Sequence, residues 1–340
     1  MSQSVIKQAE GGSPAAAAAG HRISLQALRE LTLLPAIVGV LIAGGLLNSS
    51  FLTASNFIDV AQFSAALGTV VVAESLVLLV GDLDLSLQSV YGLAPLVAAW
   101  LIVPKSQLGQ GADLPAVVGL LVLLAVGLGI GLFNGVMIVK GRFNSFIFTL
   151  AMLILLAGIQ QGIVSGNTIY AMPASFVYLG SAAWLGVPVA AWATGIIFLA
   201  GGLFLRYHRT GRAIYAIGGN IEAARAAGIQ VDRIKIGVFV VAGGLSAVAG
   251  LMTAGHVDAV TANQGNNLIF TVFAAAVIGG ISLDGGRGRI LGAFTGVVLL
   301  GLVQNLLILS QVSTFWISAA DGAIILAALL LARFVEGIRR

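Results

Sequence analysis

The chain is a succession of long apolar runs separated by short polar segments. A helix needs about 20 apolar residues to cross the roughly 30 Å hydrocarbon core of a membrane, and most of the runs approach that length. The pattern predicts an all-α integral membrane protein. Its ten expected membrane elements lie at residues 31–48, 58–80, 86–104, 114–139, 144–165, 184–205, 235–256, 267–281, 289–310 and 315–334.

The eighth element, residues 267–281, is too short to cross a membrane comfortably and ends in paired glycines. We therefore expect it to be short or re-entrant. Ten elements divide into two groups of five, and an odd number per half favours an inverted-topology repeat.

The longest polar interruption is the segment 206–235, which we call the polar island. Within it, Gly218-Gly219 predicts a flexible turn, and Asn220 is a suitable N-cap for a short helix over Ile221–Ala227. Gly228 provides a C-terminal stop for that helix. The order of turn, cap, helix and stop favours a built docking element over a plain surface loop.

The composition of the expected short helix indicates how it would dock. Glu222 lies in its first turn, where the positive end of the helix dipole favours an acid, and Arg225 follows one turn later. Three small side chains, Ala223, Ala224 and Ala227, form a face that we expect to enter a groove on another protein.

Positive charge predicts the orientation of the chain. If the N-terminus is cytoplasmic, sixteen of the seventeen Lys and Arg residues fall in cytoplasmic segments, and only Lys105 lies outside. The positive-inside rule then places both termini and the polar island in the cytoplasm. Residues 1–30 are expected to form a flexible cytoplasmic tail, and residues 31–340 the transmembrane domain.

Composition excludes several classes of protein. Apolar residues make up 59% of the chain, charged residues 9%, and the mean hydropathy is +1.04, too few charges for a soluble surface of this size. The basic balance, with a pI near 9.7, is explained by charges beside membrane helices and not by nucleic-acid binding. The chain has no cysteine, so disulfides, thiol catalysis and zinc-thiolate sites are excluded.

Signatures of enzyme chemistry are missing from the sequence. It has no Gly-Lys dipeptide and thus no phosphate-binding loop of the ATPase type. Its three histidines are scattered, with no metal-ligand spacing, and it has no nucleophile elbow. We expect no enzymatic activity, no metal site and no cofactor held by this chain.

Polar side chains inside the apolar runs are candidates for a solute pathway. Glu74 and Asp321 are ionisable residues within expected spans, which is rare in membranes. Amides suit a neutral polyhydroxy solute, but they also form ordinary hydrogen bonds between helices, and the sequence leaves both roles open. The amides in or beside spans are Asn134, Gln160, Gln161, Gln304 and Asn305. The segment 165–183, expected on the outer side, either caps the mouth of a pathway, contacts a soluble partner or is a plain loop.

Three segments carry a resemblance to a known family. The polar island from Gly211 to Ile229, GRAIYAIGGNIEAARAAGI, resembles the cytoplasmic coupling segment of permease subunits in sugar-type ABC importers, such as the ribose, xylose, arabinose and galactoside systems. GDLDLSLQSV at 81–90 resembles the G-G-x-D-L-S-x-G-S signature of that family. The stretch 274–305 resembles its late glycine-rich region.

The chain departs from the family pattern at three places. Asp82 replaces the second glycine of the signature pair, and Gln88 replaces a later glycine. The usual P-P-F-I reads Asn-Ser-Phe-Ile at 144–147. These positions bear on the pathway and the identity of the solute.

The resemblance implies a permease that relies on other subunits for energy. A second permease subunit, two cytoplasmic ATPase subunits that hold ATP and Mg²⁺, and an external solute-binding protein would complete it. The residues it assigns to ATPase coupling are Gly211, Arg212, Gly218, Gly219, Asn220, Glu222, Ala223, Ala224 and Gly228. With the polar residues of the spans, it suggests a pathway lined by Glu74, Asp82, Asp84, Ser86, Asn134, Gln160, Gln304 and Asn305.

Other functions remain open at this stage. A permease of the same superfamily could carry a nucleoside, a furanosyl signal molecule or a branched-chain amino acid. A stand-alone secondary carrier would have no need for a docking helix, and a membrane enzyme would show a site that this sequence lacks.

Overall fold

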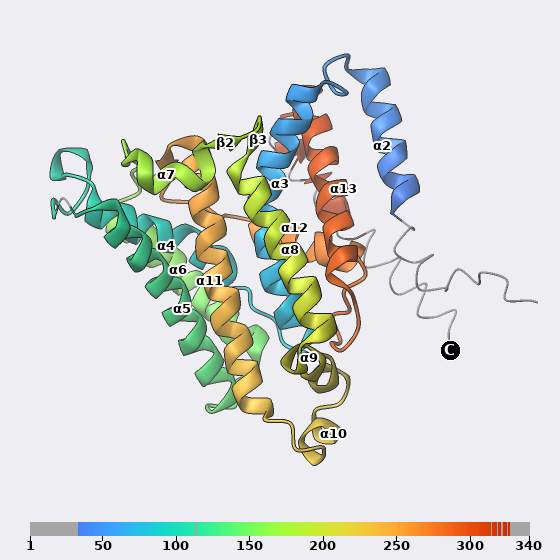
Figure 1. Cartoon of the computed structure of the whole chain (residues 1–340). Helices are drawn as coiled ribbons and strands as arrows, with labels where there is room; N and C mark the ends of the chain where they lie inside the picture. The colour runs from blue at the N-terminus through green and yellow to red at the C-terminus, as the bar shows by residue number, and fades with distance from the viewer. Residues whose placement is uncertain are drawn as a thin grey trace, which may run out of the picture.

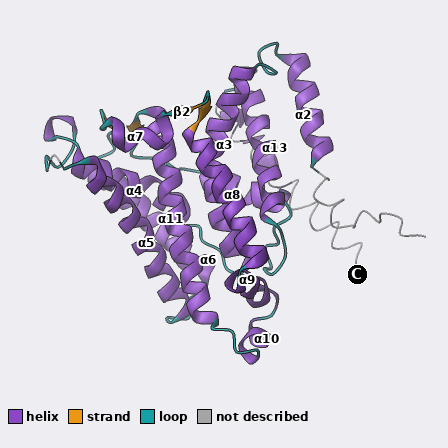
Figure 2. Cartoon of the chain, viewed as in Figure 1, coloured by secondary structure: helices purple, strands orange, loops and turns teal. Residues whose placement is uncertain are grey.

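A computed structural model of the chain describes residues 33–326, apart from positions 113, 314, 318, 321 and 325. The expected tail at 1–30, Asp321 and most of the tenth element therefore lie outside the described residues. The described part is a bundle of helices with four two-residue strands (Figure 2).

Helices occupy each of the first nine predicted membrane elements. They are α2 (Leu34–Leu47), α3 (Ala54–Leu79), α4 (Leu87–Ile102), α5 (Ala116–Val139), α6 (Ser145–Ile163), α8 (Val189–Tyr207), α11 (Val231–Val257), α12 (Leu268–Ile278) and α13 (Ile290–Leu309). Six of these, α3, α5, α6, α8, α11 and α13, are long and apolar enough to span a membrane. The fold is thus a multi-pass helical membrane bundle, while the full count of ten spans stays a prediction.

The remaining elements lie at the two ends of the bundle. At one end are α9 (Arg209–Gly219) and α10 (Ile221–Ala226), just before the first turn of α11 (Figure 1). We call this the basic end, because ten of the eleven described Lys and Arg residues lie there. At the opposite end are a 3₁₀ turn η1 (Lys105–Gln107), α7 (Ala174–Ser181) and the strands β1 (Ile169–Tyr170), β2 (Ala183–Trp184), β3 (Val187–Pro188) and β4 (Ala259–Val260).

Two helices form the centre of the bundle. Of the 26 residues of α3, 18 are buried, and α11 packs along α3, α4, α5 and α7. By contrast, α5 and α6 present rows of exposed apolar side chains, such as Leu121 and Ile154, at 64% and 65% exposure. This division of enclosed and apolar-faced helices is typical of a membrane bundle, in which the outer helices face lipid or another subunit.

Glycines allow α5 and α11 to pack at close range. Gly127, Gly131 and Gly135 lie on one face of α5, and a Cβ added at Gly131 would lie 2.3 Å from the carbonyl oxygen of Phe239 on α11. On α11, a Cβ at Gly243 would lie 2.3 Å from the carbonyl oxygen of Gly127. Close contact through small residues drives helix association in membranes, where no hydrophobic force operates between helices.

The short helices α4 and α12 each follow a segment that folds back into the bundle. Residues 80–86, which we call the re-entrant segment, turn back beside α3, so that the amide of Asp84 lies 3.4 Å from Glu74 Oε1. At the other side, Gln264 donates from Nε2 to the carbonyl oxygens of Tyr91 and Gly250 before α12 begins. The expectation of a short element at 267–281 is confirmed, since α12 has 11 residues. The inverted repeat stays a prediction.

The segment 165–183 has structure of its own. It contains β1, which pairs with β4 with Ile169 opposite Val260, and the helix α7. Part of it, together with α3 and the end of α11, lines an open cavity of about 490 Å³ that includes Asp59, Gln62 and Asp258. The interpretation as a plain loop is therefore wrong.

Candidate coupling surface and buried polar cluster

The first half of the polar island is a helix, α9, where the sequence predicted a turn at Gly218-Gly219. Both glycines are its last residues. Ile214 and Ile217 are buried on one face, and this burial outweighs the helix penalty of about 1 kcal/mol for each glycine. The predicted turn is wrong because it rested on the two glycines and did not take account of the apolar face formed by Ile214 and Ile217.

Two glycines of α9 fit against the bundle at very short range. A Cβ at Gly211 would lie 2.2 Å from the carbonyl oxygen of Phe204 at the end of α8. A Cβ at Gly218 would lie 2.0 Å from the carbonyl oxygen of Leu79 and 2.5 Å from the amide of Gly286. Only a residue without a side chain allows α9 to lie this close.

Three segments far apart in sequence therefore meet at the basic end. The amide of Gly286 donates to the carbonyl oxygen of Leu79 at 3.0 Å, and the hydroxyl of Tyr215 donates to the carbonyl oxygen of Gly288 at 3.0 Å. Burial raises the pKa of Tyr215, with Arg289 acting in the opposite direction, so the hydroxyl stays a donor at neutral pH. The end of α3, the end of α9 and the turn 282–289 thus form one joined surface.

The second half of the island matches the prediction closely. The side chain of Asn220 accepts from the amide of Ala223 at 3.0 Å, which caps α10. Gly228 has a φ of +78°, the left-handed conformation expected of a residue just after a helix. The helix itself ends at Ala226, one residue before the predicted end.

Most of α10 is exposed, but one predicted contact residue is not. Glu222, Ala223 and Arg225 are exposed, as are residues 226–228, whereas Ala224 is only 3% exposed and packs against its own chain. The expectation that Ala224 forms part of a free docking face is therefore wrong. Of the other residues assigned to coupling, Arg212, Gly219 and Asn220 are exposed.

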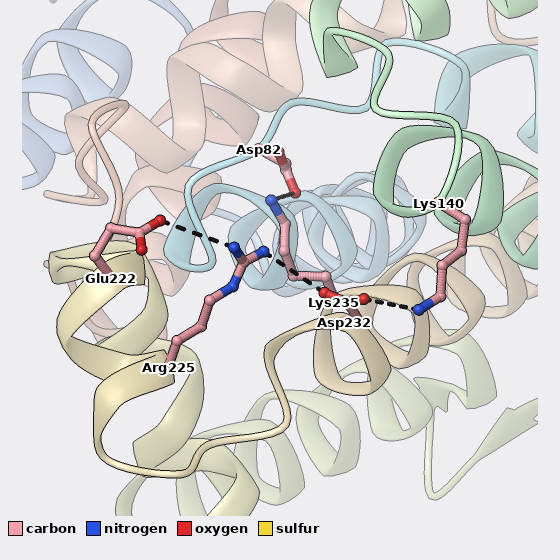
Figure 3. Close-up of polar contacts among 6 residues, drawn as sticks. All are labelled: Asp82, Lys140, Glu222, Arg225, Asp232 and Lys235. Atoms are coloured by element: carbon pink, nitrogen blue, oxygen red, sulfur yellow. Dashed lines mark hydrogen bonds and ion pairs between the residues drawn. The ribbon is translucent and has the colours of Figure 1, made fainter.

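A chain of exposed charges links α10 to two long helices (Figure 3). Arg225 lies 3.8 Å from Glu222 and 3.7 Å from Asp232 in the first turn of α11. Asp232 also receives a hydrogen bond of 2.7 Å from Nζ of Lys140, just after α5. Exposed pairs of this kind contribute about 0–1 kcal/mol each.

A second ion pair is buried, and the sequence did not predict it. Nζ of Lys235 on α11 lies 2.7 Å from Oδ2 of Asp82 in the re-entrant segment, with side chains 15% and 8% exposed (Figure 3). The two groups meet as an ion pair and not as a well-aligned hydrogen bond. No periodic pattern signals such a contact, but the departure of Asp82 from the family glycine was a clue.

Five of the predicted pathway residues gather around the re-entrant segment. Asp84 Oδ1 accepts from the Ser86 hydroxyl at 2.6 Å, and Asn134 Nδ2 donates to Ser86 Oγ at 2.8 Å. Glu74 and Asp82 complete this group, which we call the buried polar cluster. Glu74, Asp84, Ser86 and Asn134 are all 0% exposed.

The buried polar cluster is costly to maintain. Within the described part of the chain, Glu74 Oε2, Asp84 Oδ2 and Asn134 Oδ1 have no hydrogen-bond partner. Unpartnered polar atoms buried inside a membrane protein carry a free-energy penalty and are usually kept for function. The cluster is therefore the best internal candidate for a functional element.

The other three predicted pathway residues lie elsewhere. Gln160 donates to the carbonyl oxygens of Thr261 and Gln264 at 3.3 and 3.2 Å. Asn305 exchanges two hydrogen bonds of 2.9 Å with Asn56, near the opposite end, and Gln304 is buried beside it. The structure thus places the eight residues in three separate groups, all of which contact their own chain. Their role in a pathway stays a prediction.

Residues 56–332 match the family described as the branched-chain amino acid transport system / permease component. Among known proteins, the ribose import permease protein RbsC of Escherichia coli K12 is 36% identical over 289 residues, covering 84% of this chain and 88% of the relative. No solved structure matches the chain.

Two further relatives extend the range of named solutes. The L-arabinose ABC transporter permease protein AraH of Azospirillum brasilense is 34% identical, over 85% of this chain and 83% of its own length. The autoinducer 2 import system permease protein LsrC of Salmonella paratyphi B is 29% identical, over 90% and 86%. These matches confirm the resemblance to sugar-type ABC permeases, and the relatives are named as permeases and not as enzymes.

Proposed function

Because the chain belongs to the family of branched-chain amino acid transport system permease components, we propose that it is the membrane-spanning permease subunit of an ABC importer. The solute is a sugar or a similar small polyhydroxy molecule. The observation that carries the proposal is α10, a capped helix that stands exposed at the basic end of the bundle (Figure 1).

The partners follow from the same proposal. Two ATPase subunits bind ATP and Mg²⁺, and each receives one α10 from a pair of permease subunits. A solute-binding protein docks at the opposite end, where α7 and the cavity beside Asp59 and Asp258 lie. When the ATPases close, α10 and α9 move, and the bundle changes between outward and inward openings.

The orientation is supported by charge. With ten of the eleven described Lys and Arg residues at the basic end, the positive-inside rule makes that end cytoplasmic. The ATPases would then meet α10 from the cytoplasm of the host, with the permease in its inner membrane and both termini cytoplasmic.

The names of the relatives favour a sugar over the alternatives. Ribose and L-arabinose are small polyhydroxy solutes, and autoinducer 2 import is carried out by a more distant relative. The family description itself names branched-chain amino acids, which keeps that class as the second candidate. Affinity would reside mainly in the external binding protein, with this chain providing a permissive route.

The buried polar cluster has an indirect part in this proposal. Asp84 and Ser86 are 0% exposed, so they cannot touch a solute in this conformation. Their role is to hold the re-entrant segment in place beside α3 and α6. The pathway itself would form where two permease subunits meet.

The docking role of α10 can be tested with matched variants. Ala227→Arg places a bulky charge at the exposed C-cap of α10. Ala112→Arg places the same change at an exposed residue at the opposite end of the bundle. We expect Ala227→Arg to weaken ATPase binding by about 2 kcal/mol or more, the size of a typical interface hot spot. ATP-driven uptake in proteoliposomes should fall with it, while Ala112→Arg keeps ATPase binding.

Full ATPase co-purification and uptake with Ala227→Arg would remove the docking role. Uptake by the chain alone under a proton or sodium gradient, without ATPase subunits, would instead support a secondary carrier.

A further inference from the structure

Asp82 stands at a position where the family signature has glycine, and the structure gives its side chain a partner. Lys235 reaches it from α11 at 2.7 Å, and both side chains are largely buried. Lys235 is the fifth residue of α11, close to the helix N-terminus, where the dipole disfavours a cation. An acid opposite it offsets both this repulsion and the loss of water around the ammonium group.

The first residues of α11, Val231–Lys235, therefore contact both α10 and the re-entrant segment. Asp232 and Lys235 are three residues apart, so they lie on the same side of the helix. Asp232 faces Arg225 of α10, and Lys235 faces Asp82 of the re-entrant segment (Figure 3). The two ion pairs thus place this turn of α11 between α10 and the re-entrant segment.

The re-entrant segment leads into the buried polar cluster within two residues. The amide of Asp84 points to Glu74, and the amide of Leu85 donates to Thr149 Oγ1 of α6 at 3.2 Å. Through its ion pair with Lys235, Asp82 thus connects the buried polar cluster to the first residues of α11.

Building on the proposed function, we infer that Asp82 and Lys235 are positioning residues. Their ion pair holds the re-entrant segment against the N-terminal end of α11, which lies next to α10. The pair transmits the movement of α10 to the buried polar cluster. A glycine at position 82 could not form this pair.

The test uses the full chain with its ATPase subunits in proteoliposomes, and the readout is solute taken up per ATP hydrolysed. Asp82→Asn and Lys235→Met each break the pair. We expect each to lower this ratio by about tenfold, within the range of coupling that contacting residues show. The exchange Asp82→Lys with Lys235→Asp should restore at least half of the ratio, because it rebuilds the pair in reverse.

A neutral double variant separates transmission from stability. Asp82→Asn combined with Lys235→Met leaves no unpaired charge, so it should fold even if a single variant does not. If the pair transmits movement, the double variant regains thermal stability but keeps the low ratio. If the pair serves only to neutralise buried charge, the double variant regains both thermal stability and the ratio of uptake to ATP hydrolysis, and the inference is wrong.

Lys140 offers a matched control, because its ion pair is exposed. Lys140→Gln removes the exposed pair with Asp232 and should change the ratio less than about twofold, as exposed pairs contribute little. An unchanged ratio in the single variants would also overturn the inference, with the proposed function intact. Absence of ATP-driven uptake by the unaltered chain would remove the proposed function and this inference together.

Discussion

Gly218 is the residue on which the joined surface of the basic end depends. Two backbone segments, at Leu79 and Gly286, pass so close to its Cα that an added Cβ would lie 2.0 Å from the carbonyl oxygen of Leu79. The neighbouring Gly219 has no atom within 4 Å of the same position. Close packing thus requires a glycine at position 218 but not at position 219, and only the three-dimensional structure shows this difference.

Gly218→Ala should push α9 away from the end of α3. Overpacking of this kind costs about 1–3 kcal/mol, and the change should also reduce ATP-driven uptake because α9 carries α10. Gly219→Ala is the matched control and should alter stability by no more than about 0.5 kcal/mol. Thermal unfolding in detergent compares the stability of the two variants, and uptake in proteoliposomes measures the effect of Gly218→Ala on transport. An equal loss of stability in the two variants would contradict the packing seen at Gly218.

At the scale of elements, the contact between α5 and α11 rests on a glycine face. Gly131 faces the backbone of α11 at Phe239, whereas Gly129, two residues earlier, has no atom within 4 Å of an added Cβ. Helix packing in a membrane relies on such close approach. The pair of long helices is therefore sensitive to single methyl groups on one side of α5 only.

Gly131→Ala should separate the two helices and lower stability by about 1–3 kcal/mol. Gly129→Ala should be neutral or stabilising by up to about 1 kcal/mol, since it replaces glycine inside a helix without a clash. The melting temperatures of the two purified variants provide the comparison. A larger loss at Gly129 than at Gly131 would show that α5 faces another way.

Local signals explain which elements the sequence could predict. Apolar runs placed nine helices, and the cap Asn220 and stop Gly228 placed α10 to within one residue. Helix α9 was missed because its glycines suggested a turn, and α7 because its loop has no clear period. Two features could not be predicted, because they depend on which segments meet at the basic end and no local pattern in the sequence carries that information. They are the buried pair of Asp82 and Lys235 and the burial of Ala224.

At the scale of the whole molecule, charge is distributed unevenly between the two ends. The basic end carries α9, α10 and the turn 282–289, and the opposite end carries α7 and the open cavity. Such an asymmetry specifies a direction across the membrane before any partner binds. Solute and energy would therefore enter from opposite sides.

The orientation of the chain in the membrane can be measured by cysteine labelling, because the chain has no cysteine of its own. A cysteine introduced by Ala227→Cys should react with a membrane-impermeant maleimide only after the membrane is opened. One introduced by Ala112→Cys should react in intact cells, because both positions are exposed and lie at opposite ends. The reverse pattern would overturn the proposed orientation.

The enclosure of α3 has a consequence for how the protein is made. The helices that pack most closely around it, α8, α11, α12 and α13, all follow it in the chain. Its buried polar side chains, among them Thr69 and Glu74, thus enter the membrane more than a hundred residues before the last of their protein neighbours has been synthesised. The central helix of the finished bundle therefore enters the membrane well before its protein surroundings are complete.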